Sequence, residues 1–280
     1  MPITENKKIF NGIYRIKYDD KEYYFEEILK KSILKTVTDD TLKAETMAGN
    51  KVNRLWNQYQ EQHMEDISNG ITPLFTIVNS YEKKVRWIGE SVVSDIRREC
   101  YKVRPTLYKY FDTLNDREYE VMACVICELL GADKISLTAS GNEGGVDFFA
   151  RIPFSKKSHF FFGIKGPIRI VGQCKKYVNK DHVGHMKEFV TTMNNVYNKS
   201  YRVGEILPDW FKIERGHIIG WHIANAGHQS GALDIAKNYG LLVSDTKQLI
   251  EIICTSKTIR RQKEIIKYLK NLMKEERYIY

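Results

Sequence analysis

The alternation of strand-like and helix-like segments between residues 117 and 254 constrains the fold more than any other feature of this sequence. Residues 117–132 place apolar side chains at three- and four-residue spacings, which predicts a buried helix that ends at Gly131. The later segments, in chain order, are strands over 134–139, 146–152, 159–164 and 168–176, a helix over 181–197, a strand over 217–224, a helix over 230–239, a strand over 241–244 and a helix over 245–254. This order predicts an α/β fold, a mixed central sheet flanked by helices.

The first hundred residues have a different pattern, with apolar positions at helical spacing and charged residues between them. They predict helices over 21–37, 51–67 and 81–100, preceded by a short hairpin or an extended entry over 11–20. A proline and then an Asn-Asp pair lie within residues 103–116, where we expect a domain boundary. The predicted division is a mainly helical domain (1–110), an α/β domain (111–256) and a basic C-terminal helix (257–280).

The composition is that of an ordinary folded protein, with 42% apolar and 28% charged residues. The sequence contains no run of 18 or more apolar residues, and its first residues lack the apolar core of a signal peptide. These features predict a cytoplasmic protein that does not enter a membrane. The five cysteines are an odd number and are expected to be reduced thiols, and Cys124 and Cys127 lie in an apolar run that predicts core positions.

The formal net charge is +9, which favours polyanionic partners. Residues 255–280 alone hold eight basic and three acidic side chains. Two interpretations of this basic tail stay open, a solvated helix face and a surface that contacts phosphates.

Three polar side chains stand among the apolar residues of two predicted strands. Asp147 follows a glycine-rich turn, and Gln173 and Lys175 lie two positions apart near the end of a later strand. Side chains at positions i and i+2 of a strand point to the same face. If the two strands are neighbours, all three side chains converge.

Hydrolysis of a phosphodiester bond needs such a set of groups. The Asp147 carboxylate and the Gln173 amide oxygen suit a hard divalent cation such as Mg²⁺, for which Mn²⁺ can substitute. Lys175 would orient the attacking water or neutralise charge on the phosphate, and Glu120 on the preceding helix could add an oxygen ligand. The predicted catalytic residues are Asp147, Gln173, Lys175 and Glu120, and the predicted metal ligands are Asp147, Gln173 and Glu120.

The segments around these residues resemble a known family. Tyr119-Glu120 on a helix, then LLGADKISLTASGNEGGVDFFARI, VGQCKKY and a helix with HMKEF resemble the Mrr-type restriction endonuclease domain of the PD-D/E-x-K nuclease superfamily. The likeness covers about residues 115–255 and implies a role for Glu120, Asp147, Gln173 and Lys175 in one active site. Two features depart from the family, because 25 residues separate Asp147 from Gln173 and nothing before residue 110 matches a winged-helix reader.

Other polar residues admit simpler explanations. Glu143 in the glycine turn could be a metal ligand or a solvated turn residue, and we favour the latter. His182 with His185, and His222 with His228, lack the spacing of a known metal motif and are interpreted as surface or supporting residues. The N-terminal aromatic residues could stack on bases but are expected to form core.

These observations predict a magnesium-dependent endonuclease that cuts DNA, which the family resemblance places in prokaryotic restriction or anti-phage defence. The alternative is a nucleic-acid-binding or complex-assembly subunit whose cutting is absent or gated by a protein partner. A homo-oligomer is expected, since one active site cuts one strand.

Overall fold

The computed structural model describes residues 3–87, 95–139, 145–153, 167–198, 200, 207–211 and 217–279. The chain forms two compact units, Met1–Tyr110 and Phe111–Tyr280. None of the described helices is both long and apolar enough to cross a membrane.

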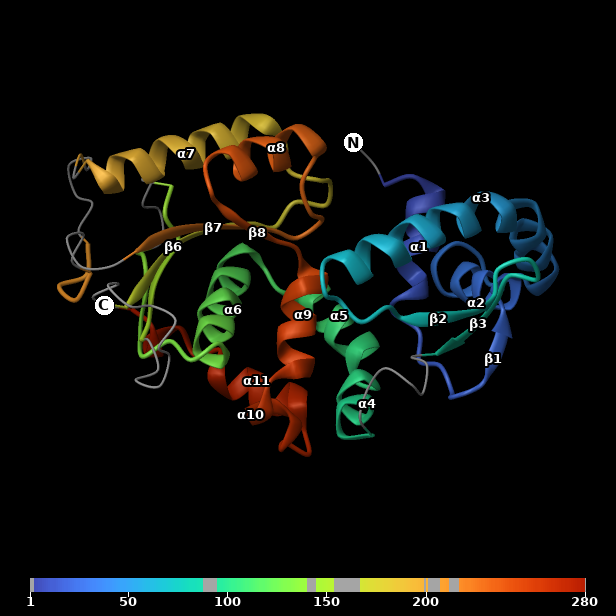
Figure 1. Ribbon diagram of the computed structural model, residues 1–280. Helices are drawn as coiled ribbons and strands as arrows, with labels where there is room; N and C mark the ends of the chain where they lie inside the picture. Colours follow the sequence, from blue (N-terminus) through green and yellow to red (C-terminus); the bar gives the residue numbers. More distant parts are fainter. Residues whose placement is uncertain are drawn as a thin grey trace. The chain divides into compact units, whose positions relative to one another are not determined.

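The first unit combines helices with a small antiparallel sheet (Figure 1). Its elements are α1 (Glu5–Ile13), β1 (Glu22–Tyr24), α2 (Phe25–Thr36), α3 (Thr41–Ser68), β2 (Phe75–Asn79), β3 (Lys84–Trp87), α4 (Asp95–Tyr101) and the start of α5 (Arg104–Thr113). The strands pair in the order β1-β3-β2. Aromatic side chains fill its core, among them Trp56, Tyr59 and Trp87, as the sequence predicted.

Two predictions for this unit were wrong. The helix expected over 81–100 begins instead as strand β3, because Val85 and Trp87 alternate into the core while the strand pairs with both β1 and β2. The short hairpin, one of the two alternatives for residues 11–20, lies instead at β2 and β3, and α1 extends to Ile13. Residues 103–116, where a domain boundary was expected, contain α5. The first unit ends at Tyr110, within this helix.

The second unit is built on a five-stranded mixed sheet. Its elements are α6 (Asp116–Leu129), β4 (Lys134–Leu137), β5 (Phe148–Ile152), β6 (Ile168–Lys175), α7 (Val183–Tyr197), β7 (Ile218–Ala224), α8 (Ser230–Asn238), β8 (Leu242–Ser244) and α9 (Thr246–Thr255). The strand order is β4-β5-β6-β7-β8, antiparallel from β4 to β6 and parallel from β6 to β8. In Figure 1, α7 and α8 cover one face and α6 and α9 the other. The predicted mixed sheet flanked by helices is therefore confirmed.

Local sequence signals fix the ends of α6. The Asn115 side chain accepts a hydrogen bond from the Glu118 N–H (2.8 Å), and the Glu118 carboxylate accepts one from the Asn115 N–H (2.7 Å). At the other end Gly131 adopts a φ of 94°, and the Ala132 N–H bonds to the Cys127 carbonyl. Cys124 and Cys127 are fully buried in the core, as predicted.

The C-terminal segment differs from the single helix that its periodicity predicts. It forms α10 (Lys257–Arg260), α11 (Ile265–Leu272) and a short 3₁₀ turn (Glu275–Arg277). The break between the helices allows Ile259 and Leu269 both to be fully buried. Beyond the turn, the Leu137 N–H bonds to the Tyr278 carbonyl, so the end of the chain covers the edge strand β4. The strand expected over 159–164 lies outside the described residues.

Gly172 in β6 has no room for a side chain, because the Phe148 ring of β5 packs against it. It pairs with Phe148, whose ring is fully buried, and a Cβ at Gly172 would lie 2.0–2.5 Å from three ring atoms. We expect Gly172→Ala to lower the free energy of unfolding by roughly 1–3 kcal/mol, because the enclosed ring has no free space to move into. Urea denaturation would measure this loss, and an unchanged midpoint would contradict the packing described.

Candidate active site

Asp147 immediately precedes β5 and is hydrogen-bonded to strand β6. Its N–H donates to the Gly172 carbonyl (2.8 Å), and its carboxylate Oδ2 accepts a hydrogen bond from the Cys174 N–H (2.5 Å). Asp147 is thus bonded to both neighbours of Gln173 in β6. On its other side the Asp147 carbonyl accepts from the Thr138 N–H and hydroxyl. The sheet therefore holds this carboxylate in a fixed place at the end of the β5–β6 ladder.

Gln173 is buried, and one end of its amide is held in place. Its Nε2 donates to the Gly145 carbonyl (2.9 Å). Gly145 has a φ of +77°, and a Cβ there would lie 2.7 Å from the Thr192 hydroxyl, so this turn position requires glycine. The Gln173 Oε1 is buried and has no hydrogen-bond partner among the described residues. A buried acceptor without a partner costs free energy and suits a cation.

The pKa of Asp147 is raised to about 7. Burial is the largest cause, and the negative charge of Glu120 is the second. The Cys174 N–H and the positive charges of Lys175 and Arg117 oppose this increase without cancelling it. Near neutral pH the ionised carboxylate is therefore disfavoured, which a bound cation would reverse.

The negative charge of Glu120 raises the pKa of Asp147, and Glu120 itself forms an ion pair with Arg117. Arg117, one helical turn earlier on α6, donates from Nη1 to the Glu120 carboxylate (2.8 Å). The same guanidinium donates to the Thr138 carbonyl and to Glu275, each at 2.8 Å. Burial raises the pKa of Glu120, and Arg117 lowers it in part. Arg117 carries no distinguishing signal in the sequence, since Arg-Glu pairs three residues apart on a helix are common.

Lys175 ends β6 and is only partly buried. Its positive charge lowers the pKa values of Asp147 and of His222, so the ammonium lies near both side chains. The structure thus brings Asp147, Gln173, Lys175 and Glu120 to one end of the sheet. Glu143 lies outside the described residues.

These residues fit a hard divalent cation. The two carboxylates and the amide oxygen are all oxygen donors, which Mg²⁺ and Mn²⁺ prefer. The unpartnered Gln173 Oε1 and the raised pKa of Asp147 are the two observations that a cation would account for.

His222 and His228 lie in the core rather than at the surface, which was one of the two positions expected for them. Both are buried, with 0% and 6% exposure, and the His222 Nδ1 lies 2.9 Å from the His228 Nε2. Asp181, which the sequence analysis did not single out, lies beside them at 1% exposure. His182 is exposed and caps α7, and its nitrogen accepts from the Gly184 N–H.

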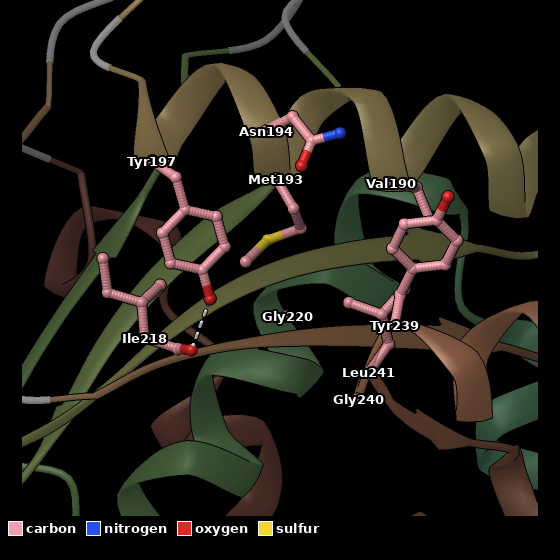
Figure 2. A pocket seen from close by; sticks show the side chains of 9 residues that line it. All are labelled: Val190, Met193, Asn194, Tyr197, Ile218, Gly220, Tyr239, Gly240 and Leu241. Atoms are coloured by element: carbon pink, nitrogen blue, oxygen red, sulfur yellow. Dashed lines mark hydrogen bonds between the residues drawn. The ribbon is translucent and has the colours of Figure 1, made fainter.

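A pocket on the α7 face of the sheet is separate from these residues. Figure 2 shows its lining, in which the Tyr197 hydroxyl donates to the Ile218 carbonyl (2.8 Å). Its volume is about 50 Å³, and none of its lining residues is a candidate site residue. Such a volume holds a few waters at most, so we do not assign a substrate to it.

Comparison with known proteins gives distant matches only. No family model and no curated protein matches the chain. The MspJI restriction endonuclease, in complex with a 27-mer oligonucleotide, is 16% identical with a TM-score of 0.42, over 70% of this chain and 42% of that one. The DNA modification-dependent restriction endonuclease AspBHI is 13% identical with a TM-score of 0.39, over 64% of this chain and 40% of that one. This chain thus spans about two fifths of the length of each of these two enzymes.

Proposed function

We propose that the second unit is a divalent-metal-dependent endonuclease that hydrolyses phosphodiester bonds of DNA. The observation that carries the proposal is the pairing of two groups on adjacent strands. The pKa of the Asp147 carboxyl is raised to about 7, and the Gln173 Oε1 is buried with no hydrogen-bond partner among the described residues. A phosphodiester-bound Mg²⁺ ion would satisfy both.

The chain's own residues have distinct roles in this proposal. Asp147 and Gln173 would hold the ion, and Glu120 would add an outer or a direct oxygen ligand. The bound ion would polarise the phosphate and lower the pKa of a water molecule. Lys175 would place its ammonium beside the phosphate oxygen that gains negative charge. Arg117 would position Glu120 through their ion pair.

The substrate and the biological role are proposed from the charge of the chain and from the family resemblance. The excess of basic residues favours a polyanion, and the resemblance of residues 115–255 to Mrr-type domains favours DNA and a role in prokaryotic restriction or anti-phage defence. The first unit would recognise DNA or a partner protein, and two copies of the chain would cut the two strands.

A second candidate is a nuclease gated by a partner in a defence complex. The Arg117–Glu120 ion pair favours it, because the Arg117 guanidinium engages the carboxylate that would otherwise face the metal. A partner that displaced Arg117 would free this carboxylate for the metal.

Supercoiled and linear DNA should be incubated with the full chain in Mg²⁺, in Mn²⁺ and in EDTA, beside Asp147→Asn and the exposed control Asp234→Asn. We expect cutting in Mg²⁺ and Mn²⁺, none in EDTA, and loss in Asp147→Asn only. Metal-independent cutting, cutting of RNA alone, or full activity of Asp147→Asn would each contradict the proposal. Cutting that requires a cell extract would favour the gated form.

A further inference from the structure

Three buried side chains from separate segments converge beside the end of the sheet. Asp181 precedes α7, His222 belongs to β7, and His228 precedes α8. Potential metal-ligating atoms of all three lie within 4.8 Å of one another. The backbone holds two of them together, because the Asp181 N–H donates to the Gly227 carbonyl and the Gln229 N–H donates to the Asp181 carbonyl.

Two atoms of this cluster face each other without a hydrogen bond. The Asp181 Oδ2 and the His222 Nε2 are 3.6 Å apart, both residues are at most 1% exposed, and neither atom has a hydrogen-bond partner among the described residues. Zinc–ligand bonds of about 2.0–2.1 Å in a tetrahedral site separate donor atoms by about 3.3 Å. The observed separation is close to that value.

The second carboxylate oxygen of Asp181, Oδ1, is held by a histidine. The His185 Nδ1 lies 2.5 Å from Oδ1, one helical turn into α7. Histidine–carboxylate pairs of this kind commonly fix the orientation of metal ligands. Within the described ranges, the side chains that pair with this buried carboxylate are imidazoles rather than lysine or arginine. A buried carboxylate with such partners would gain from a cation.

We propose that Asp181, His222 and His228 bind a transition-metal dication of the Zn²⁺ class, with water completing its shell. Two imidazole nitrogens and one carboxylate oxygen favour Zn²⁺ over Mg²⁺, whereas the oxygen donors around Asp147 favour Mg²⁺. His228 would exchange its hydrogen bond with His222 for a bond to the metal. The competing explanation is a metal-free chain of hydrogen bonds in which the His222 Nε2–H points to Asp181.

Such a metal would be structural and separate from catalysis. It would tie together the segment before α7, strand β7 and the turn before α8. His222 is paired in register with Gln173, so the ion would also stabilise the strand that neighbours the candidate active site. The proposal does not depend on nuclease activity.

The full chain should be stripped of metal with a chelator and titrated with Co²⁺, whose visible bands report nitrogen and oxygen ligands, and then with Zn²⁺ as competitor. We expect one ion per chain, a rise in melting temperature with Zn²⁺, and Co²⁺ bands that Mg²⁺ in excess does not remove. His228→Gln should weaken Zn²⁺ binding at least about 100-fold. The exposed control His217→Gln and the variant Asp147→Ala should bind Zn²⁺ normally.

Failure of the folded wild-type chain to bind Zn²⁺ at one ion per chain would overturn the proposal, whatever the variants do. Binding that His228→Gln retains would also overturn it. Loss of binding in Asp147→Ala would place the ion at the candidate active site instead. If His228→Gln does not fold, Asp181→Asn gives the same test, with circular dichroism as the check on folding.

Discussion

Lys175→Ala should lower the rate of metal-dependent DNA cleavage by about 1,000-fold while leaving the fold intact. The Lys175 ammonium lies near Asp147 at the end of β6, where it would stabilise charge that develops on the phosphate. Removing one such preorganised group typically lowers kcat by about 10²–10³-fold, and we expect the upper end because Lys175 is the only lysine of the proposed set. Single-turnover cleavage of a labelled duplex would measure the loss.

The neighbouring lysine provides a matched control. The Lys176 Nζ donates to the Asp112 carbonyl (3.3 Å), outside the candidate site. Lys176→Ala removes the same charge from the same strand end, so it should retain most of the cleavage rate. Comparable losses in the two variants would show that general positive charge, rather than a placed ammonium, supports cleavage.

Mg²⁺ binding should weaken as the pH falls below 7, by about fivefold over the first pH unit and about tenfold over the next. The pKa of Asp147 is raised to about 7 by burial and by Glu120, so a proton competes with the ion for this carboxylate below that pH. Between pH 7 and pH 5 we expect about a 50-fold loss of affinity, with little change above pH 8. Calorimetric titration of Mg²⁺ or Mn²⁺ into the chain at several pH values would measure it.

Asp147→Asn separates this effect from general acid sensitivity. Asparagine can still accept the Cys174 N–H hydrogen bond, but it has no proton to exchange with the ion. The variant should bind Mg²⁺ weakly and with a much flatter pH dependence, to which Glu120 alone contributes. Wild-type affinity that is constant from pH 5 to pH 8 would contradict the role given to Asp147.

The second unit could be predicted well from the sequence because its elements are marked locally. Strands β5 and β6 are apolar runs bounded by glycine and proline, and α6 carries a capping box at Asn115 and a terminating Gly131. The helix predicted over 81–100 was wrong over β3, because Val85 lies at helical spacing from Tyr81 and at alternating spacing from Trp87. Only pairing with β1 and β2 decides between them.

Proximity across the fold was harder to predict than residue type. Asp147, Gln173 and Lys175 could be named because strand periodicity places them at strand ends. Asp181 could not, since its contact with His228 arises from an isolated bridge between two loops. Likewise, Arg117 gains its role from simultaneous contacts with Glu120, Thr138 and Glu275, which lie far apart in the chain.

A crystal structure of the chain soaked in Mn²⁺, with anomalous diffraction recorded at the manganese edge, would test the central claim most directly. We predict an ion bound by the Asp147 carboxylate and the Gln173 Oε1 at about 2.1 Å, displaced by excess Mg²⁺. Manganese found only at Asp181, His222 and His228, or an active protein with no ion at Asp147, would contradict it.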